Sequence, residues 1–309
     1  MWQKTIILPK TFVFKDESLK TTIGILARLN NLRRKEIYID FSRVEQIRKS
    51  DLMVLMAQLE KMTIEKKSVK VKGKIPKNIS DLFDEFYEKD THEKITHLNL
   101  VPTMKNAIYA RDINPSIVEN TVQDLNRLGV NNDSHGYGFY ERIKALLTEI
   151  IGNAVEHGIK NRNINYWLAS KVKNNQQVVT FVDMGKGIAY SHKKSKLPLY
   201  YRITGLFSDN KIVMDSLLGK LRSSTRDPFR GKGLPEIREI IEKEFVSEFV
   251  LITNKTLIQY RKNKFTTSKI ANFKGTYYCW TISKQNFEKW KISQSTLPQI
   301  SVRISADGL

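Results

Sequence analysis

Cysteine is almost absent from this sequence of 309 residues, in which Cys279 stands alone. A single cysteine can form neither an intramolecular disulfide nor a cysteine-based zinc cluster, so neither kind of covalent or metal cross-link stabilises this chain. Long apolar runs are absent as well, because no stretch of about 18 consecutive apolar residues occurs and lysines interrupt the apolar N-terminal segment. We therefore expect a cytoplasmic protein with neither a membrane-spanning helix nor an export signal.

Acidic residues are scarce relative to basic ones, with 32 Asp and Glu against 52 Lys and Arg and a net charge of +20. The first 100 residues hold 20 basic and 14 acidic side chains, so most of the excess lies in the rest of the chain. Such a charge attracts polyanions, and nucleic-acid binding is one interpretation of it. The alternative is a lysine-rich sequence whose charges are spread over solvated faces.

The first 90 residues alternate short β-rich runs with amphipathic segments, which is typical of an α/β unit. The expected strands are 5–14, 36–41 and 68–71, and the expected helices are 17–34, 50–62 and 80–87. Ser50 and Asp51 are the N-cap candidates of the second helix, and Ser80 is that of the third.

The strand order and the segment 38–61, YIDFSRVEQIRKSDLMVLMAQLEK, resemble the STAS-like domains of anti-sigma-factor antagonists over about residues 1–95. In that family, a serine in a loop of the type DSSG can accept phosphate. Here Arg48 and Lys49 replace the usual Asp and first Ser, so Ser50 is the remaining candidate acceptor. Its simpler role is an N-cap.

The segment 148–158, TEIIGNAVEHG, lies on an expected helix that begins near Gly138 and buries an apolar stripe. Glu149, Asn153 and His157 are four residues apart and therefore share one flank of that helix. The amide oxygen of Asn153 suits Mg²⁺, which prefers oxygen ligands. Glu149 is placed to orient or deprotonate a water or hydroxyl that attacks a γ-phosphate. This flank predicts a metal–nucleotide site.

An apolar strand expected at 178–182 ends in Asp183, and a Gly-x-Gly follows at Gly185 and Gly187. A carboxylate can accept a hydrogen bond from the exocyclic amine of adenine. The glycines have no Cβ, so the backbone can come close to a base. The same pattern also serves ordinary tight turns, so it is weak when taken alone.

A third segment places Gly231 and Gly233 just before a strong helical run. Free backbone N–H groups at a helix N-terminus can hold phosphate. Arg230 and Lys232 add charge that suits a polyphosphate. This segment therefore predicts a phosphate-binding loop.

The fourth segment, 274–282, reads KGTYYCWTI and is an expected β-strand opened by Gly275 and Thr276. Its aromatic residues are Tyr277, Tyr278 and Trp280. They permit a base-stacking platform, but we favour a strand with one face in the core and the other covered by a helix. Cys279 fits the role of a small buried hydrophobe.

In this order, the motifs ExxxNAxxHG, DxGxGI, GxGL and GT resemble those of the GHKL ATPases, the superfamily of gyrase, heat-shock chaperone, histidine kinase and mismatch-repair ATPases. The resemblance covers about residues 135–290 and implies a Bergerat-type sandwich that binds ATP between helices and an antiparallel-rich mixed sheet. It implies that Asn153 holds Mg²⁺, Glu149 is the general base and Asp183 reads adenine. The other nucleotide-binding residues that it implies are His157, Gly185, Gly187, Ile188, Thr225, Arg230, Gly231, Lys232, Gly233, Leu234 and Thr276.

The sequence departs from the superfamily pattern in two places. Pro235 stands where many relatives have another glycine, although proline is sterically welcome in the first turn of a helix. No histidine has the context of the phosphoacceptor of two-component histidine kinases. Glu149 resembles instead the base of the ATPases and of the anti-sigma serine kinases.

These resemblances imply an α/β (α+β) chain in which nucleotide acts as a switch. The expected layout is a STAS-like domain at 1–100, a helical connector at 101–134, an ATPase domain at 135–292 with a lid at 189–230, and a tail at 293–309. We expect a regulatory ATPase or serine/threonine kinase that uses ATP and Mg²⁺ and acts on its STAS-like domain, a protein partner or a second copy. The alternatives are a nucleic-acid-associated ATPase and a module that binds ATP without turnover.

Overall fold

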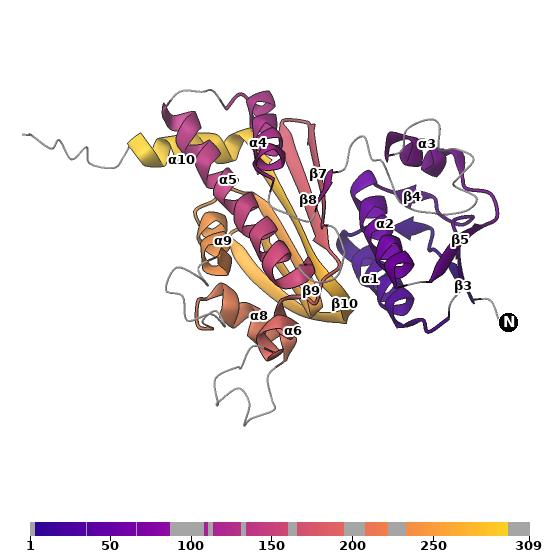
Figure 1. Ribbon diagram of the computed structural model, residues 1–309. Helices are drawn as coiled ribbons and strands as arrows, with labels where there is room; N and C mark the ends of the chain where they lie inside the picture. Colours follow the sequence, from indigo (N-terminus) through magenta and orange to yellow (C-terminus); the bar gives the residue numbers. More distant parts are fainter. Residues whose placement is uncertain are drawn as a thin grey trace, which may run out of the picture.

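The computed structural model describes residues 4–34, 36–65, 67–86, 108–110, 114–130, 134–159, 166–194, 208–221 and 233–295. These residues form a mixed α/β structure with a three-stranded parallel sheet, a five-stranded antiparallel sheet and a short parallel pair of strands (Figure 1). The parallel sheet belongs to the N-terminal part of the chain and the antiparallel sheet to the C-terminal part. The coarse fold class expected from the sequence is thereby confirmed.

The N-terminal part is built on three parallel strands, β1 (Lys4–Ile7), β3 (Glu36–Asp40) and β5 (Ser68–Lys72), in the order β1-β3-β5. Helices α1 (Asp16–Asn31) and α2 (Lys49–Ile64) connect them, as parallel strands require a crossover. A further helix, α3 (Lys77–Phe86), follows β5. Two short strands, β2 (Thr11–Phe12) and β4 (Gln46–Ile47), pair with each other.

Three details of the N-terminal predictions were wrong. The strand expected at 5–14 is two strands, because Pro9, between β1 and β2, cannot donate to a ladder. The N-cap of α2 is Arg48, and Asp51 at the third helical position accepts the Arg48 backbone N–H at 3.3 Å. Helix α3 begins three residues before Ser80, whose backbone N–H donates to the carbonyl of Pro76.

The C-terminal sheet has five strands in the order β6-β7-β8-β10-β9, and each described pairing is antiparallel. The strands are β6 (Ile108–Ala110), β7 (Tyr166–Lys173), β8 (Gln176–Asp183), β9 (Glu248–Arg261) and β10 (Lys264–Ser283). Tight turns at Asn174–Asn175 and Lys262–Asn263 close two hairpins, with positive φ at all four residues, as a type I′ turn requires. The described strands of this sheet contain no parallel pair, whereas the resemblance to the GHKL ATPases implied an antiparallel-rich mixed sheet.

Helices of the C-terminal part cover one face of this sheet, here called the α5 face (Figure 1). The longest is α5 (Ser134–Asn153), which continues into a π-helical turn at Ala154–Ile159. Against it pack α4 (Pro115–Gln123), α9 (Gly233–Glu242) and α10 (Lys284–Ser295). Two short helices, α6 (Ile188–Lys194) and α8 (Asp209–Leu217), lie against β9. A 3₁₀ turn, Asp124–Leu128, follows α4.

The opposite face of the sheet is covered by helices α1 and α2, which contact β10, β7 and β8. Tyr277 on this face stacks on Phe14 with ring centroids 4.9 Å apart. Since side chains alternate along a strand, Tyr278 points to the α5 face, where it meets Phe181 and Phe249. Both tyrosines are buried, so the expectation of one core face and one helix-covered face is confirmed and no stacking platform is exposed here.

Candidate functional site

Helix α5 carries the first motif because its apolar stripe anchors it to the core. Phe139, Ile143 and Leu146 are among the buried residues of this stripe. Glu149 and Asn153 lie on the flank beside the stripe and are half-buried. The two side chains therefore sit at the edge of the core, where a polar group keeps access to a ligand.

The N-terminus of α9 lies directly against these two side chains. A Cβ added at Gly233 would overlap the Glu149 carboxylate and would approach Asn153 Nδ2 to 3.2 Å. Only glycine fits this position without displacing the acid. The fold thus joins Glu149, Asn153 and the first residue of α9, although about 80 residues separate the two helical segments in sequence.

The electrostatics of Glu149 differ from those of a solvated carboxylate. Burial raises the pKa of Glu149, and the negative charges of Glu236 and Glu156 raise it further. A carboxylate with a raised pKa is a stronger base at neutral pH than an exposed one. The charges of Glu149, Glu156 and Glu236 therefore repel one another. Within the described ranges, no three His, Cys, Asp or Glu side chains are arranged to hold a metal ion.

The amide of Asn153 has no hydrogen-bond partner for its buried Nδ2 atom among the described residues. Leaving a buried amide without a hydrogen-bond partner costs about 1–3 kcal/mol. Such an amide is therefore expected to bind a ligand or to be rotated about its last side-chain bond. The nitrogen and oxygen of an amide exchange places on rotation, so the same position suits an oxygen ligand. Asn153 therefore fits the role of a ligand to Mg²⁺ that is otherwise coordinated by phosphate and water.

A second cluster lies at the C-terminal end of β8 around Asp183. Its side chain is 2% exposed and accepts the backbone N–H of Gly185 at 2.8 Å. Burial raises the pKa of Asp183 to about 6, while hydrogen bonds from Gly185 and Thr276 and the charge of Lys61 act in the opposite direction. Asp183 is thus ionised at neutral pH but titrates within the accessible range.

The fourth motif meets this carboxylate across the sheet. Thr276 of β10 pairs with Asp183 of β8 in the antiparallel register, so their side chains share one face. Gly275 adopts a φ of +137°, and a Cβ there would overlap the carbonyl oxygen of Asp183. This close approach requires glycine.

Two residues outside the predicted motifs hold the Gly-x-Gly loop. Asn254 of β9 donates from Nδ2 to the carbonyl of Lys186 at 2.9 Å and accepts the N–H of Tyr190 at 3.2 Å. A Cβ at Gly187, whose φ is +78°, would overlap the Asn254 amide. Thr253 accepts the N–H of Ile188 at 2.9 Å and donates to the carbonyl of Gly275 at 3.1 Å. Thr253 thus ties the second motif to the fourth.

The two clusters are linked through the π-helical turn that ends α5, which contacts β7 and β8. This turn includes His157, so the four-residue spacing from Asn153 to His157 does not continue in α-helical geometry. Leu234 follows Gly233 in α9 and is half-buried. The side chain of His157 and the residues Thr225, Arg230, Gly231 and Lys232 lie outside the described residues.

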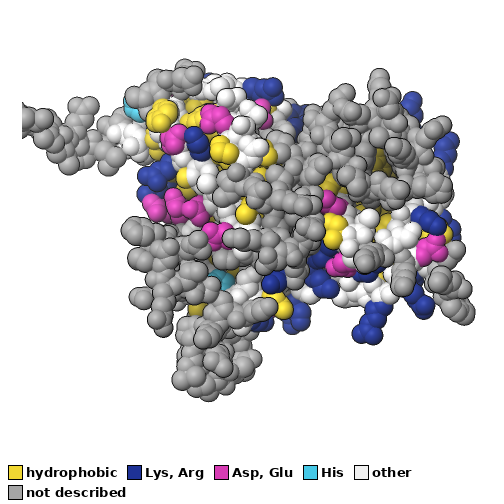
Figure 2. All heavy atoms as spheres, in the orientation of Figure 1, with side chains coloured by type: hydrophobic (Ala, Val, Ile, Leu, Met, Phe, Trp, Pro, Cys, Tyr) yellow, Lys and Arg dark blue, Asp and Glu magenta, His cyan; other side chains and the backbone are white. Residues whose placement is uncertain are grey.

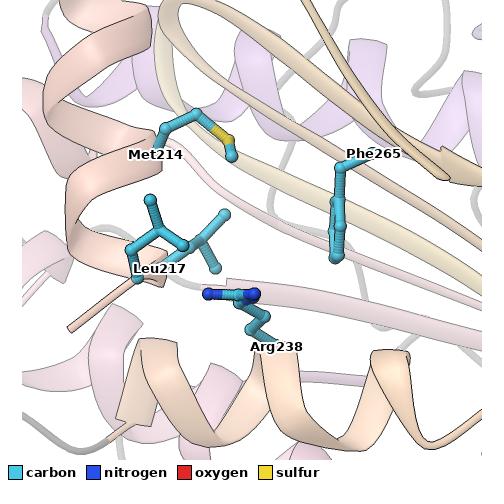
Figure 3. Close-up of a pocket in the computed structure, with 5 residues that line it drawn as sticks. Met214, Leu217, Arg238 and Phe265 are labelled. Atoms are coloured by element: carbon cyan, nitrogen blue, oxygen red, sulfur yellow. The ribbon is translucent and has the colours of Figure 1, made fainter.

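A cavity of about 210 Å³ lies elsewhere, between α8, α9 and the β9–β10 hairpin. Figure 3 shows Met214 and Leu217 of α8, Arg238 of α9 and Phe265 of β10 around it. Arg238 donates to Glu242 at 2.8 Å, so its charge is compensated. None of the residues predicted from the motifs lines this cavity.

Comparison with known proteins adds no relative to these observations. Neither a scan of family models nor a search of curated proteins gives a match to this chain. Within the described ranges, no helix combines the length and the apolar character needed to cross a membrane.

Proposed function

We propose that the C-terminal part is a Bergerat-type ATPase domain of the GHKL class, and that the protein is an Mg-ATP-dependent regulatory switch with a STAS-like N-terminal domain. The observation that carries this proposal is the convergence of motifs that are distant in sequence. Gly233 abuts Glu149 and Asn153, and Gly275 and Thr276 abut Asp183. A chance set of glycine turns and polar residues would have no reason to meet in this way.

Each side chain then has a defined part in handling ATP. Asp183 accepts a hydrogen bond from the exocyclic amine of adenine. Gly187 and Gly275 let the backbone come close to Asn254 and to the Asp183 carbonyl, which holds the loop around this carboxylate in place. The N-terminus of α9 offers free backbone N–H groups to the phosphates. Asn153 holds Mg²⁺, which neutralises charge that develops on the phosphoryl group. Glu149 takes the proton from the attacking water or hydroxyl.

The geometry bears on which hydroxyl would receive phosphate. Ser50 lies in the first turn of α2, one residue before Asp51, which accepts the N–H of Phe14, and the Phe14 ring stacks on Tyr277. Tyr277 points to the face that carries the N-terminal part, whereas Glu149 lies on the α5 face. Ser50 and the base are therefore on opposite faces of the sheet. We propose that water or a partner protein accepts the phosphoryl group.

The large net charge does not by itself favour a nucleic-acid function. The aromatic residues that would stack on bases, Tyr277, Tyr278 and Trp280, are buried. On the face drawn in Figure 2, the described Lys and Arg side chains are scattered among acidic and apolar ones and form no continuous stripe. We therefore propose the ATP-dependent function alone.

The test is to incubate the full chain with γ-labelled ATP and Mg²⁺ and to follow phosphate release and protein labelling together. We expect wild type to bind ATP, Asn153→Ala to lose the Mg²⁺ dependence of binding, and Glu149→Gln to bind ATP without turnover. Glu239→Gln is the matched control, since Glu239 in α9 is exposed and pairs with Lys243. Absence of ATP binding in the wild type would overturn the proposal.

A further inference from the structure

Three buried polar side chains form a row across the C-terminal sheet. Thr276 of β10 pairs with Asp183 of β8 on one side and with Thr253 of β9 on the other. Residues directly opposite each other in a sheet point to the same face, so all three side chains lie on the α5 face with Tyr278. The exposed fraction is 2% for Asp183, 6% for Thr276 and 0% for Thr253. The row therefore leads from the proposed adenine-reading carboxylate to Thr253.

The strand pairing is irregular at Thr253. Between its pairings with Asn254 and Thr253 of β9, strand β10 contains two extra residues, Lys274 and Gly275, which form a bulge. Gly275 has a φ of +137° in this bulge, and Asn254 has a φ of +51°. A bulge interrupts the hydrogen-bond ladder, so its backbone groups need other partners. Thr253 Oγ1 is one such partner, because it donates to the Gly275 carbonyl at 3.1 Å.

The first turn of helix α6 is capped by side chains of β9. The residue before α6 is Gly187, which has no side chain to accept the first N–H groups of the helix. Thr253 Oγ1 accepts the N–H of Ile188 at 2.9 Å, and Asn254 Oδ1 accepts that of Tyr190 at 3.2 Å. Two adjacent residues of β9 therefore fix the start of α6.

The hydroxyl of Thr253 thus joins the two segments that flank Asp183. A hydroxyl has one proton to donate, and that of Thr253 goes to Gly275, in the bulge before Thr276. Its oxygen accepts the N–H of Ile188, at the end of the loop that follows Asp183. Because Thr253 is fully buried, its effect on a nucleotide would pass through these two segments.

We propose that Thr253 and Asn254 are positioning residues of the nucleotide site, which hold the loop after Asp183 against the β10 bulge and so keep this carboxylate where adenine can donate to it. This inference rests on the proposed ATP-binding function. Asp183 is held in turn by the N–H of Gly185, in the same loop, at 2.8 Å. Release of the loop therefore displaces the acceptor of adenine. Glu149 lies at the contact of α5 with α9, outside these hydrogen bonds, so the turnover rate of bound ATP is expected to stay unchanged.

The test compares two substitutions of Thr253 in the full chain. Thr253→Val keeps nearly the same shape and removes the hydroxyl, whereas Thr253→Ser keeps the hydroxyl. ATP binding in the presence of Mg²⁺ is measured by calorimetry, and phosphate release gives kcat. We expect Thr253→Val to raise the Kd for ATP roughly tenfold, with unchanged stoichiometry and kcat, and Thr253→Ser to bind ATP as wild type does. A partly unfolded variant would instead lower the stoichiometry and leave Kd unchanged.

Thr256 provides the matched control on the same strand. It is also 0% exposed, but its hydroxyl has no hydrogen-bond partner among the described residues. Thr256→Val is therefore expected to leave the Kd for ATP unchanged. Wild-type affinity in Thr253→Val, or an equal loss of affinity in Thr253→Ser and Thr253→Val, would overturn the inference.

A second variant tests the same role if Thr253→Val does not fold. Asn254→Gly removes the amide that accepts the Tyr190 N–H, and glycine readily adopts the φ of +51° at this position. We expect it to raise the Kd for ATP roughly fivefold. Asn175→Gly is its control, because Asn175 is exposed in a hairpin turn and has a φ of +55°. Equal affinities in these two glycine variants would contradict the role of Asn254.

Failure of the inference can be told from failure of the proposed function. If wild type and Thr253→Val bind ATP equally well, the function stands and the positioning role is wrong. If wild type binds no ATP, the function fails and the positioning role fails with it. Amide hydrogen exchange followed by NMR then tests the hydrogen bond itself, since the Ile188 N–H is expected to exchange faster in Thr253→Val than in Thr256→Val. Equal exchange rates would refute the hydrogen bond.

Discussion

The two faces of the C-terminal sheet are both buried, yet by different chemistry. The α5 face is packed with aromatic side chains such as Tyr166, Phe181 and Tyr278, whose rings contact one another. The face toward the N-terminal part combines the Phe14–Tyr277 stack with the buried charges of Glu60 and Lys61. Polar groups buried at a contact specify its geometry at a cost in stability. The first face is therefore a core and the second a specific interface.

The largest expected effect comes from breaking the α5 face. Phe181 is fully buried between Tyr166 and Tyr278, at centroid distances of 5.4 and 6.1 Å. We expect Phe181→Ala to lower the free energy of unfolding by about 3–5 kcal/mol, through lost burial and a residual cavity. Urea denaturation followed by tryptophan fluorescence measures this. A loss below about 1 kcal/mol would show that the face is not a packed core.

A smaller loss of stability is expected from a substitution of a buried polar residue in the N-terminal part. Asp51 is fully buried and accepts the Phe14 N–H at 3.1 Å and the Arg48 guanidinium at 2.6 and 2.8 Å. Asp51→Ala leaves these donors without their acceptor, and we expect it to cost about 2–3 kcal/mol. Asp81→Ala in α3 is the control, because Asp81 is exposed. Equal unfolding midpoints for the two variants would contradict the structural role of Asp51.

The third prediction concerns pH. Burial raises the pKa of Asp183 in the folded chain from 3.8 to about 6. The folded state therefore binds the proton more tightly than the unfolded state, so stability falls as pH rises from about 4 to 6 and the penalty persists above pH 6. We expect Asp183→Asn to raise the free energy of unfolding at pH 7 by about 3 kcal/mol.

Thermal unfolding of Asp183→Asn and wild type at pH 4.5 and pH 7 checks this sign. The stabilisation is expected at pH 7 and is expected to shrink at pH 4.5, where Asp183 is already protonated. The same variant is expected to lose ATP-dependent stabilisation, since an amide presents a donor as well as an acceptor to adenine. A variant less stable than wild type at pH 7 would show that ionised Asp183 supports the fold.

The sequence predicted the elements whose pattern is periodic and missed those whose pattern is not. Helix α5 and its polar flank follow from apolar spacing, and the contact of Gly233 with Glu149 agrees with the motif order. The three-residue strand β6 is too short to show a period. Strand β9 is buried on both faces over much of its length and so lacks alternation.

Two residues that hold the candidate site were not predicted from the sequence, for a different reason. Thr253 and Asn254 belong to no motif, because their function is to hold backbone groups of a distant loop. Contacts between segments far apart in sequence decide both roles, and a single sequence does not contain them.

The smallest changes in stability are expected from two glycine-to-alanine variants, which distinguish an effect on ATP turnover from an effect on folding. A Cβ added at Gly24 in α1 would meet no atom within 4 Å, whereas a Cβ added at Gly233 would overlap the Glu149 carboxylate. Gly24→Ala is expected to stabilise the chain by about 0.5–1 kcal/mol through helix propensity, with ATP binding unchanged. Gly233 is the first residue of α9, where the propensity gain is smaller than in a helix interior. Gly233→Ala displaces Glu149, so we expect a small net change in stability and a loss of ATP turnover.

Calorimetric ATP titration, a phosphate-release assay and thermal unfolding of both glycine variants measure this contrast. Full turnover in Gly233→Ala would show that the contact between α9 and Glu149 is not part of the site. A loss of ATP binding in Gly24→Ala would show that α1 reaches the nucleotide through the interface, because this substitution displaces no neighbouring atom. The two faces of the sheet would then act as one unit in ATP binding, and the distinction between a core and an interface would hold for stability alone.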